Sequence, residues 1–186
     1  VNNVQTYTSA VSNYLQGTRA QLEIVADMPE MSQPLSDTLI DPSLHGVPAD
    51  AAIPQREAAA DLMRHSQGIR HISLLRANGD VYFMEPYEEQ LKLSRTNLAY
   101  NAWYQELEST GETVISDLVI CPADQTPAAV IAVPVHGPDG QIAGILAGDM
   151  ILEQLSQVGT SAWKGETPLS WGYITDSRGL VIAHEA

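Results

Sequence analysis

The 186-residue sequence has little cysteine and little positive charge. Its one cysteine, Cys121, cannot form a disulfide within the chain. Nine Lys and Arg residues stand against 23 Asp and Glu residues, which gives a formal net charge of −14. This excess repels nucleic acid and anionic lipid head groups, so the sequence predicts neither as a partner. It does not specify a ligand, because a solvated acidic surface has the same composition.

Long apolar runs, a signal peptide and an initiator methionine are also lacking. The longest apolar stretch, 142–152, is interrupted by glycine and aspartate. It is shorter than the ~18–20 apolar residues that cross a bilayer as a helix. We therefore expect a fragment of a longer protein, in which any contact with a membrane is made by segments outside this chain.

Motifs of catalysis are missing as well. The sequence contains no Walker loop, no dinucleotide glycine motif, no Gly-x-Ser-x-Gly elbow and no His-Glu-x-x-His pattern. No histidine or basic residue stands beside Cys121 in the sequence to lower the pKa of its thiol, so a packed thiol is expected rather than a nucleophile. The sequence predicts no enzyme activity, no cofactor and no metal site.

Apolar residues recur at spacings of three, four and seven between positions 4 and 27, which predicts one helix of about six turns. Pro29 stops this helix. The stripe is longer than one small domain needs, so we expect a stalk helix that forms a parallel homodimer in the full protein. Its residues are Val4, Tyr7, Val11, Tyr14, Leu15, Leu22 and Val25.

The rest of the chain alternates between helical and strand-like patterns. A proline-containing loop, 28–54, precedes a helix at 55–67 with Gly68 as its expected C-cap. Asn78-Gly79 predicts a type I′ hairpin turn between strands 69–75 and 81–84. A helix at 98–109, ended by Gly111, is followed by strands 114–121, 128–135 and 141–150, a helix at 151–158 and a final hairpin at 172–184. This order indicates an α+β fold with a five-stranded antiparallel sheet.

Five segments in this order resemble Cache domains, the PAS-like extracellular sensors of bacterial and archaeal chemoreceptors, sensor histidine kinases and diguanylate cyclases. The resemblance covers about residues 4–158 and implies a long N-terminal helix packed on a PAS-like antiparallel five-stranded sheet with flanking helices. The segments that carry it are Leu22–Pro29, Ile72–Phe83, Tyr100–Tyr104, Ala128–Val135 and Gly144–Asp149.

The tail, 172–184, resembles the first hairpin of the membrane-proximal module of double Cache proteins. The resemblance thus implies a stalk helix at 1–30, a membrane-distal ligand-binding module at 31–158 and the start of a truncated second module at 159–186. The alternative is a single Cache domain whose last strand is the tail. The implied function is small-molecule sensing in the periplasmic or extracellular part of a membrane receptor. The alternative function is a ligand-free interaction domain that dimerises and docks a periplasmic binding protein.

The resemblance also implies a pocket between the helix at 98–109 and the sheet. In amino-acid-binding members, an arginine and a Trp-Tyr pair hold the carboxylate, and aspartates on the sheet hold the ammonium group. This chain has Asn101 at the position of the arginine and Ile115 at that of a tyrosine, and Asn cannot make the bidentate bonds of a guanidinium. The candidate ligand-binding residues are Tyr82, Arg95, Tyr100, Asn101, Trp103, Tyr104, Ser116, Asp117 and Asp149.

Two ligand classes and several structural roles remain open for these residues. An amine or a quaternary ammonium compound fits if Asp117 and Asp149 both face the pocket, where Trp103 and Tyr104 could stack on the cation. A small carboxylate fits if Arg95 turns inward. Without any ligand, Trp103 could be a core residue, Asp149 could cap the helix expected from Ile151, and Asp117 could be a solvated strand end.

Overall fold

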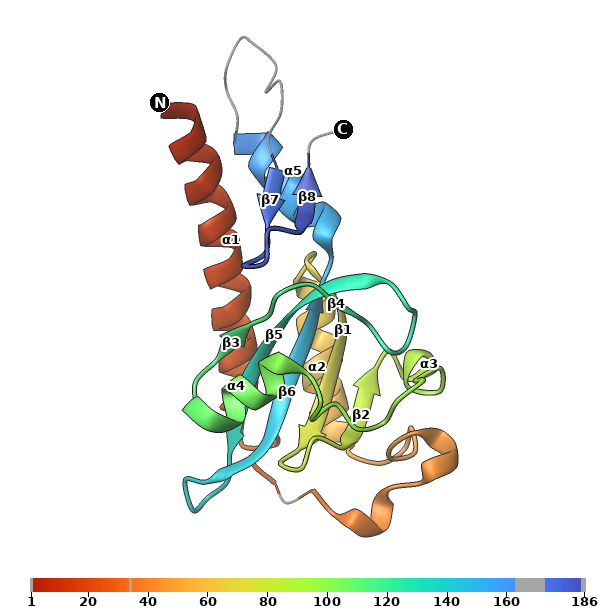
Figure 1. Cartoon of the computed structure of the whole chain (residues 1–186). Helices are drawn as coiled ribbons and strands as arrows, with labels where there is room; N and C mark the ends of the chain where they lie inside the picture. The colour runs from red at the N-terminus through yellow and green to blue at the C-terminus, as the bar shows by residue number, and fades with distance from the viewer. Residues whose placement is uncertain (1, 34, 163–172, 185–186) are drawn as a thin grey trace.

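The computed structural model describes residues 2–33, 35–162 and 173–184 and has the α+β fold that the sequence predicts (Figure 1). Its helices are α1 (Asn2–Ala26), α2 (Ile53–His65), α3 (Tyr87–Gln90), α4 (Ala102–Thr110) and α5 (Leu152–Ala162), with short 3₁₀ turns at Asp37–Leu39 and Pro42–Leu44. Its strands are β1 (Ile69–Arg76), β2 (Val81–Glu85), β3 (Val114–Ile115), β4 (Val119–Ile120), β5 (Pro127–His136), β6 (Ile142–Met150), β7 (Tyr173–Thr175) and β8 (Val181–His184). Within these ranges, no helix combines the length and the apolar character that crossing a membrane requires.

A six-stranded antiparallel sheet forms the body of the protein. Its strand order is β2-β1-β6-β5-β3, and β4 pairs with β5 beside β3. In this register Asp149 on β6 stands opposite His71 on β1 and opposite Val130 on β5. Cross-strand neighbours share a face of the sheet, so these three residues form one row on the same face.

Each face of the sheet carries its own apolar core. Helices α1 and α2 cover one face with residues that include Leu22, Ala59 and Leu62, which pack on Ile72 and Leu146. Helix α4 and the loops around it cover the opposite face with a second cluster. That second cluster contains Leu75, Met84, Leu98, Trp103, Tyr104, Leu107, Cys121, Val130 and Ala147.

The first half of α1 extends past the sheet and lies beside α5 (Figure 1). A Cβ atom added at Gly159 of α5 would approach the ring of Tyr7 on α1 to 2.1 Å, so the glycine permits this close packing. Strands β7 and β8 pair with each other in a separate two-stranded sheet. In the described residues the tail therefore does not extend the main sheet, and the division into two modules stays a prediction.

Four local predictions differ from the structure. The turn after β1 is not type I′, because Gly79 has a positive φ (+86°) and Asn78 does not. Helix α2 ends at a C-cap of Ser66 in extended conformation, so Gly68 is not the cap. The helix expected from residue 98 begins only at Ala102. The strand expected at 114–121 is split into β3 and β4, because the N–H of Val130 donates to the hydroxyl of Ser116.

A buried arginine, Arg56, ties α2 to the edge of the sheet. It is 6% exposed and forms an ion pair with Glu85, and its guanidinium also lies over the rings of Phe83 and Tyr87. The hydrogen bonds that its side chain donates go to Val47 O, Ala51 O, Met84 O, Glu85 Oε1 and Gln90 Oε1. Sequence reasoning did not single out this residue.

Candidate functional site

A small cavity lies between α4 and the face of the sheet that carries the row of His71, Val130 and Asp149. Its volume is about 20 Å³, enough for one water molecule. Its lining includes three of the nine residues predicted from the sequence, Asn101, Trp103 and Asp149. It also includes Ser73, Cys121 and Val130.

Trp103 combines a packing role with an unused donor. Its ring is 3% exposed and meets the ring of Tyr104 edge to face at a centroid distance of 6.3 Å. Its indole Nε1 is buried and has no hydrogen-bond partner among the described residues. A buried N–H without a partner costs about 1–3 kcal/mol. A ligand with an acceptor atom that reaches this N–H would therefore bind more tightly.

Asp149 supplies the acidic side of the cavity. Its Oδ2 lies 3.4 Å from Nδ1 of His71 on the neighbouring strand. Helix α5 begins at Leu152, and the Asp149 carboxylate is directed to the sheet partner instead of to the N–H groups of that helix. Asp149 thus places a carboxylate in a mostly apolar wall, where desolvation strengthens charge-assisted contacts.

Tyr104 and Tyr82 do not line the cavity. The hydroxyl of Tyr104 donates to the carbonyl of Ala77 in the β1–β2 turn, and burial raises the pKa of that hydroxyl. Tyr82 belongs to the apolar cluster on the opposite face of the sheet. The side chain of Asn101 lines the cavity and donates to the carbonyl of Leu98, which fixes the first turn before α4.

Arg95 and Tyr100 lie outside the cavity and contact each other. The guanidinium of Arg95 is 4.8 Å from the centre of the Tyr100 ring, and that ring is half exposed. Ser116 serves the backbone, since its hydroxyl donates to the carbonyl of Asp117 and accepts from the N–H of Val130. None of these side chains lines the cavity in this conformation.

Asp117 joins the loop between β3 and β4 to the turn of the β7–β8 hairpin. Its carboxylate accepts hydrogen bonds from the N–H and the hydroxyl of Ser177 at 2.8 and 2.6 Å. The carboxylate of Asp176 accepts from the N–H of Leu118, and Arg178 donates to the Leu118 carbonyl. These hydrogen bonds form a clasp between residues 117–118 and the turn at 176–178. Residues 119–122, which follow directly in the sequence, line the cavity. Only a few residues of chain therefore separate the cavity wall from the clasp.

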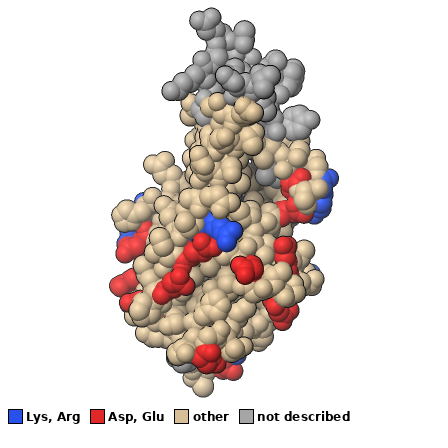
Figure 2. Space-filling view, turned by 90° about the vertical axis from the view of Figure 1, so that its left-hand side faces the viewer, with Lys and Arg blue, Asp and Glu red and all other residues tan. Residues whose placement is uncertain are grey.

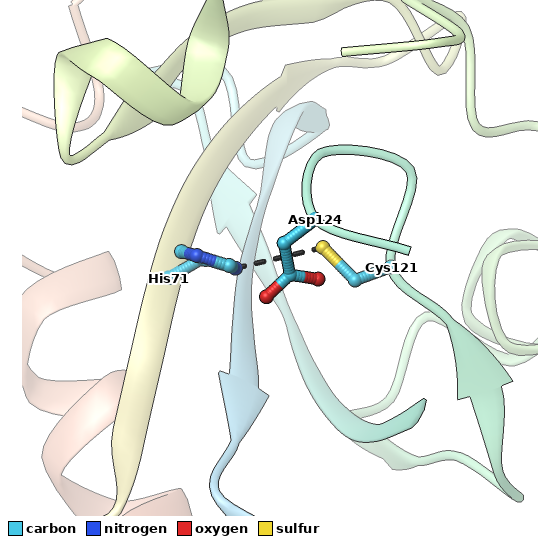
Figure 3. Close-up of side chains that lie close together, drawn as sticks. All are labelled: His71, Cys121 and Asp124. Carbon is cyan, nitrogen blue, oxygen red and sulfur yellow. Dashed lines mark hydrogen bonds between the residues drawn. The ribbon is translucent and has the colours of Figure 1, made fainter. Parts of the chain in front are cut away.

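The structure also brings together three side chains that the sequence analysis did not connect (Figure 3). His71 on β1 points toward Cys121 and Asp124, which follow β4. One ligand-type atom from each lies within 4.8 Å of the others, and the distance from His71 Nδ1 to Cys121 Sγ is 3.5 Å. Only the spacing of Cys121 and Asp124 is visible in the sequence, because His71 stands 50 positions earlier.

Cys121 therefore has a histidine neighbour in the fold, His71, although no histidine stands beside it in the sequence. The thiol is 1% exposed. Burial, followed by the negative charge of Asp149, raises the pKa of the Cys121 thiol well above its usual range. The expectation of a packed, unreactive thiol is consistent with this environment.

Acidic groups outnumber basic groups on the face of the molecule that Figure 2 shows. On the face drawn in Figure 2, acidic groups lie in several separate places among uncharged atoms, with few basic groups between them. This agrees with the net charge of −14.

No protein-family profile and no curated protein sequence matches the chain. Among solved structures, it is similar to the ligand-binding domain of the Pseudomonas aeruginosa amino acid chemoreceptor PctB in complex with L-Gln, with a TM-score of 0.64 and 18% identity over 86% of this chain and 57% of that domain. It is also similar to the sensory domain of the Campylobacter jejuni chemoreceptor Tlp3 with isoleucine bound, with a TM-score of 0.67 and 17% identity over 98% of this chain and 68% of that domain. A third similar structure is the P. aeruginosa receptor PctC in complex with GABA, with a TM-score of 0.61 and 18% identity over 86% of this chain and 65% of that domain.

At these identities the likeness concerns the fold, and the chain spans little more than half the length of the PctB domain. The fold expected from the resemblance to Cache sensors is confirmed. The chain has the fold of the ligand-binding domains of bacterial chemoreceptors.

Proposed function

We propose that this chain is the small-molecule-sensing part of a membrane receptor, located outside the cytoplasm, and that it binds an amino acid or a related amine between α4 and the sheet. One observation carries the proposal. An unpaired buried donor, Trp103 Nε1, and a carboxylate, Asp149, line the same cavity. The similar receptor structures hold L-Gln, isoleucine and GABA, all of which carry an ammonium and a carboxylate group.

The two polar groups suit the two ends of an amino acid. The N–H of Trp103 would donate to the carboxylate, and Asp149 would accept from the ammonium group. A charge-assisted hydrogen bond contributes about 1.5–3 kcal/mol, so the contact with Asp149 would provide most of the polar affinity. Because Asn101 takes the place of an arginine and Arg95 stacks on Tyr100 outside the cavity, we favour amines and amino acids over simple carboxylates.

The size of the cavity implies a conformational step. Sites for small molecules typically have volumes of about 300–1,000 Å³, whereas this cavity has about 20 Å³. A ligand must therefore displace the segments that close it, 98–103 and 119–122. The apparent affinity of the ligand then equals its affinity for the open form multiplied by the fraction of molecules that are open.

Movement of segment 119–122 would displace the turn of the β7–β8 hairpin. Asp117 and Leu118, which precede this segment, hold the turn at 176–178 through hydrogen bonds. A ligand that binds the open form better than the closed form shifts the balance between the two. We propose that this clasp is one connection between the pocket and the rest of the receptor.

Parallel dimerisation through α1 remains part of the proposal. Ile24 on this helix is 64% exposed and is the side chain that we expect at such a contact, because Val11, Leu22 and Val25 of the predicted stripe pack in the core of this chain. Docking of a periplasmic binding protein without a ligand is the less favoured alternative, because the similar structures bind small molecules themselves.

The test is a thermal-shift screen followed by calorimetry, in metal-free buffer with chelator, against the amino acids, GABA, simple amines and short carboxylates. We expect stabilisation by amino acids or amines. The change of Asp149→Asn should weaken binding by about 10- to 100-fold, which corresponds to the loss of one charge-assisted bond. Trp103→Phe removes the N–H while retaining an aromatic ring and should weaken binding by about 5- to 10-fold.

Tyr100→Phe is the matched control, because this ring lies outside the cavity. It should bind like the original chain. If no compound in the panel binds, or if Asp149→Asn binds as tightly as the original chain, the proposed site is wrong.

A further inference from the structure

The cluster shown in Figure 3 consists of three side chains of the kinds that bind metal ions. An imidazole, a thiol and a carboxylate from three different positions converge within 4.8 Å. His71 and Cys121 are buried, and Asp124 is partly exposed. Nitrogen, sulfur and carboxylate oxygen are the donor types that zinc takes in proteins.

We propose that His71, Cys121 and Asp124 form a binding site for a divalent transition metal, with Zn²⁺ as the best match. A thiolate ligand selects zinc over Mg²⁺ and Ca²⁺, which prefer oxygen donors alone. Three protein ligands leave a fourth tetrahedral position for water or another donor. Asp149 lies beside that position, because its Oδ2 is 3.4 Å from the same nitrogen of His71.

The distance between two of the three ligands fits a tetrahedral ion. Zinc–ligand bonds of about 2.0–2.3 Å place neighbouring ligand atoms about 3.3–3.8 Å apart. The distance between His71 Nδ1 and Cys121 Sγ is 3.5 Å. The ligand atoms of all three residues lie within 4.8 Å of one another, so the Asp124 carboxylate has to move closer to bind the same ion. A hydrogen-bonded cluster has similar distances, so the experiment must separate the two.

The turn that carries two of the ligands is held by its own hydrogen bonds. The N–H of Cys121 donates to the Thr126 carbonyl, and the N–H of Gln125 donates to the Cys121 carbonyl. The Oδ1 atom of Asp124 accepts from both the N–H and the hydroxyl of Thr126. Such outer contacts orient metal ligands before the ion arrives.

The charge of the surroundings suits a divalent ion. When Cys121 binds as a thiolate, it contributes one negative charge, and Asp124 and Asp149 contribute one each. The guanidinium of Arg70, whose Nε is 3.3 Å from Asp124 Oδ2, contributes one positive charge. The sum is −2, which a Zn²⁺ ion neutralises. The thiol must release its proton to bind.

The inference is tested with the metal alone. Zn²⁺ is titrated by calorimetry into the chain in buffer free of chelator and of organic ligand. Co²⁺ serves as a spectroscopic probe, because a thiolate ligand gives a near-ultraviolet charge-transfer band. We expect one Zn²⁺ per chain and a cobalt–thiolate band that Zn²⁺ abolishes. Ca²⁺ and Mg²⁺ should neither bind tightly nor displace cobalt.

Two separate variants address the ligands, so that misfolding of one does not leave the question open. Cys121→Ser, which is nearly the same shape, should lose the cobalt band, and His71→Gln should weaken Zn²⁺ binding by more than 100-fold. Asp149→Asn, which removes the negative charge beside the fourth position, should weaken Zn²⁺ binding less than His71→Gln does. His65→Gln, a change at an exposed histidine on α2, is the matched control and should bind like the original chain.

The inference is overturned if Zn²⁺ does not bind, or if Cys121→Ser and His71→Gln bind it as tightly as the original chain. Its failure is distinct from failure of the proposed function, because the amino acid screen is done with chelator and the metal titration without organic ligand. Amino acids that bind while zinc does not would remove only the metal site. Zinc that binds while the organic panel does not would remove only the amino acid site.

Discussion

The change of Arg56→Met tests how α2 is held to the edge of the sheet. The guanidinium is buried with the carboxylate of Glu85, and methionine fills much of its volume without charge or donors. In the variant, Val47 O still accepts a hydrogen bond from Gln90 Nε2, and Gln90 Oε1 still accepts one from the N–H of Met84. These two acceptors therefore lose only one of their hydrogen bonds. Glu85 is left as a half-buried charge without the guanidinium.

Breaking a buried ion pair by removing one partner costs about 3–5 kcal/mol. Because domains of this size have unfolding free energies of about 5–15 kcal/mol, the variant should lose at least about a fifth of its stability. Urea unfolding followed by circular dichroism would show this as a midpoint lower by on the order of 2 M. Arg64→Met, which removes an exposed guanidinium from the same helix, is the control and should cost less than about 1 kcal/mol.

The double change Arg56→Met with Glu85→Leu should regain part of the loss, because it removes the unpaired carboxylate as well. A cost below about 1 kcal/mol for Arg56→Met would refute the view of Arg56 as a structural centre. So would a double variant that is less stable than the sum of the two single changes.

Three further predictions concern the hairpin and its surroundings. Asp117→Ala should release the β7–β8 turn, seen as faster exchange of the Ser177 amide hydrogen, while the main sheet keeps its protection. Gly159→Ala should destabilise the packing of α5 on the Tyr7 ring by about 1–3 kcal/mol, measured by urea unfolding, and no loss would contradict the close approach. Hydrogen bonds from the turn outweigh desolvation and lower the pKa of Asp176 below 3.8. The stabilisation from this carboxylate is therefore complete above that value and lost as the pH falls through the lowered pKa. An NMR titration should give a midpoint below the ordinary value of an aspartate carboxyl group, and a midpoint at or above that ordinary value would contradict this.

Local pattern was enough to predict the main elements. The apolar stripe and Pro29 predicted α1, and alternation between residues 69 and 84 predicted the first hairpin, because periods of 3.6 and 2 are properties of single segments. Gly111 was correctly placed at the end of α4, where its φ of +71° suits a residue without a Cβ atom. The turn at Asn78-Gly79 was predicted in position but not in type, because turn type depends on how the flanking strands twist and pair.

The site depended on tertiary structure to a much greater degree. Trp103 and Asp149 were predicted for the pocket and line one cavity, yet nothing in the sequence showed that Tyr104 turns toward Ala77 or that Arg95 stacks outside. Neither Arg56 nor the cluster of His71, Cys121 and Asp124 was foreseen. Sequence patterns report which face of a helix or strand a residue occupies. Which residues meet is decided by strand register and by loops that close over the sheet, and the contact between His71 and Asp149 joins positions 78 residues apart.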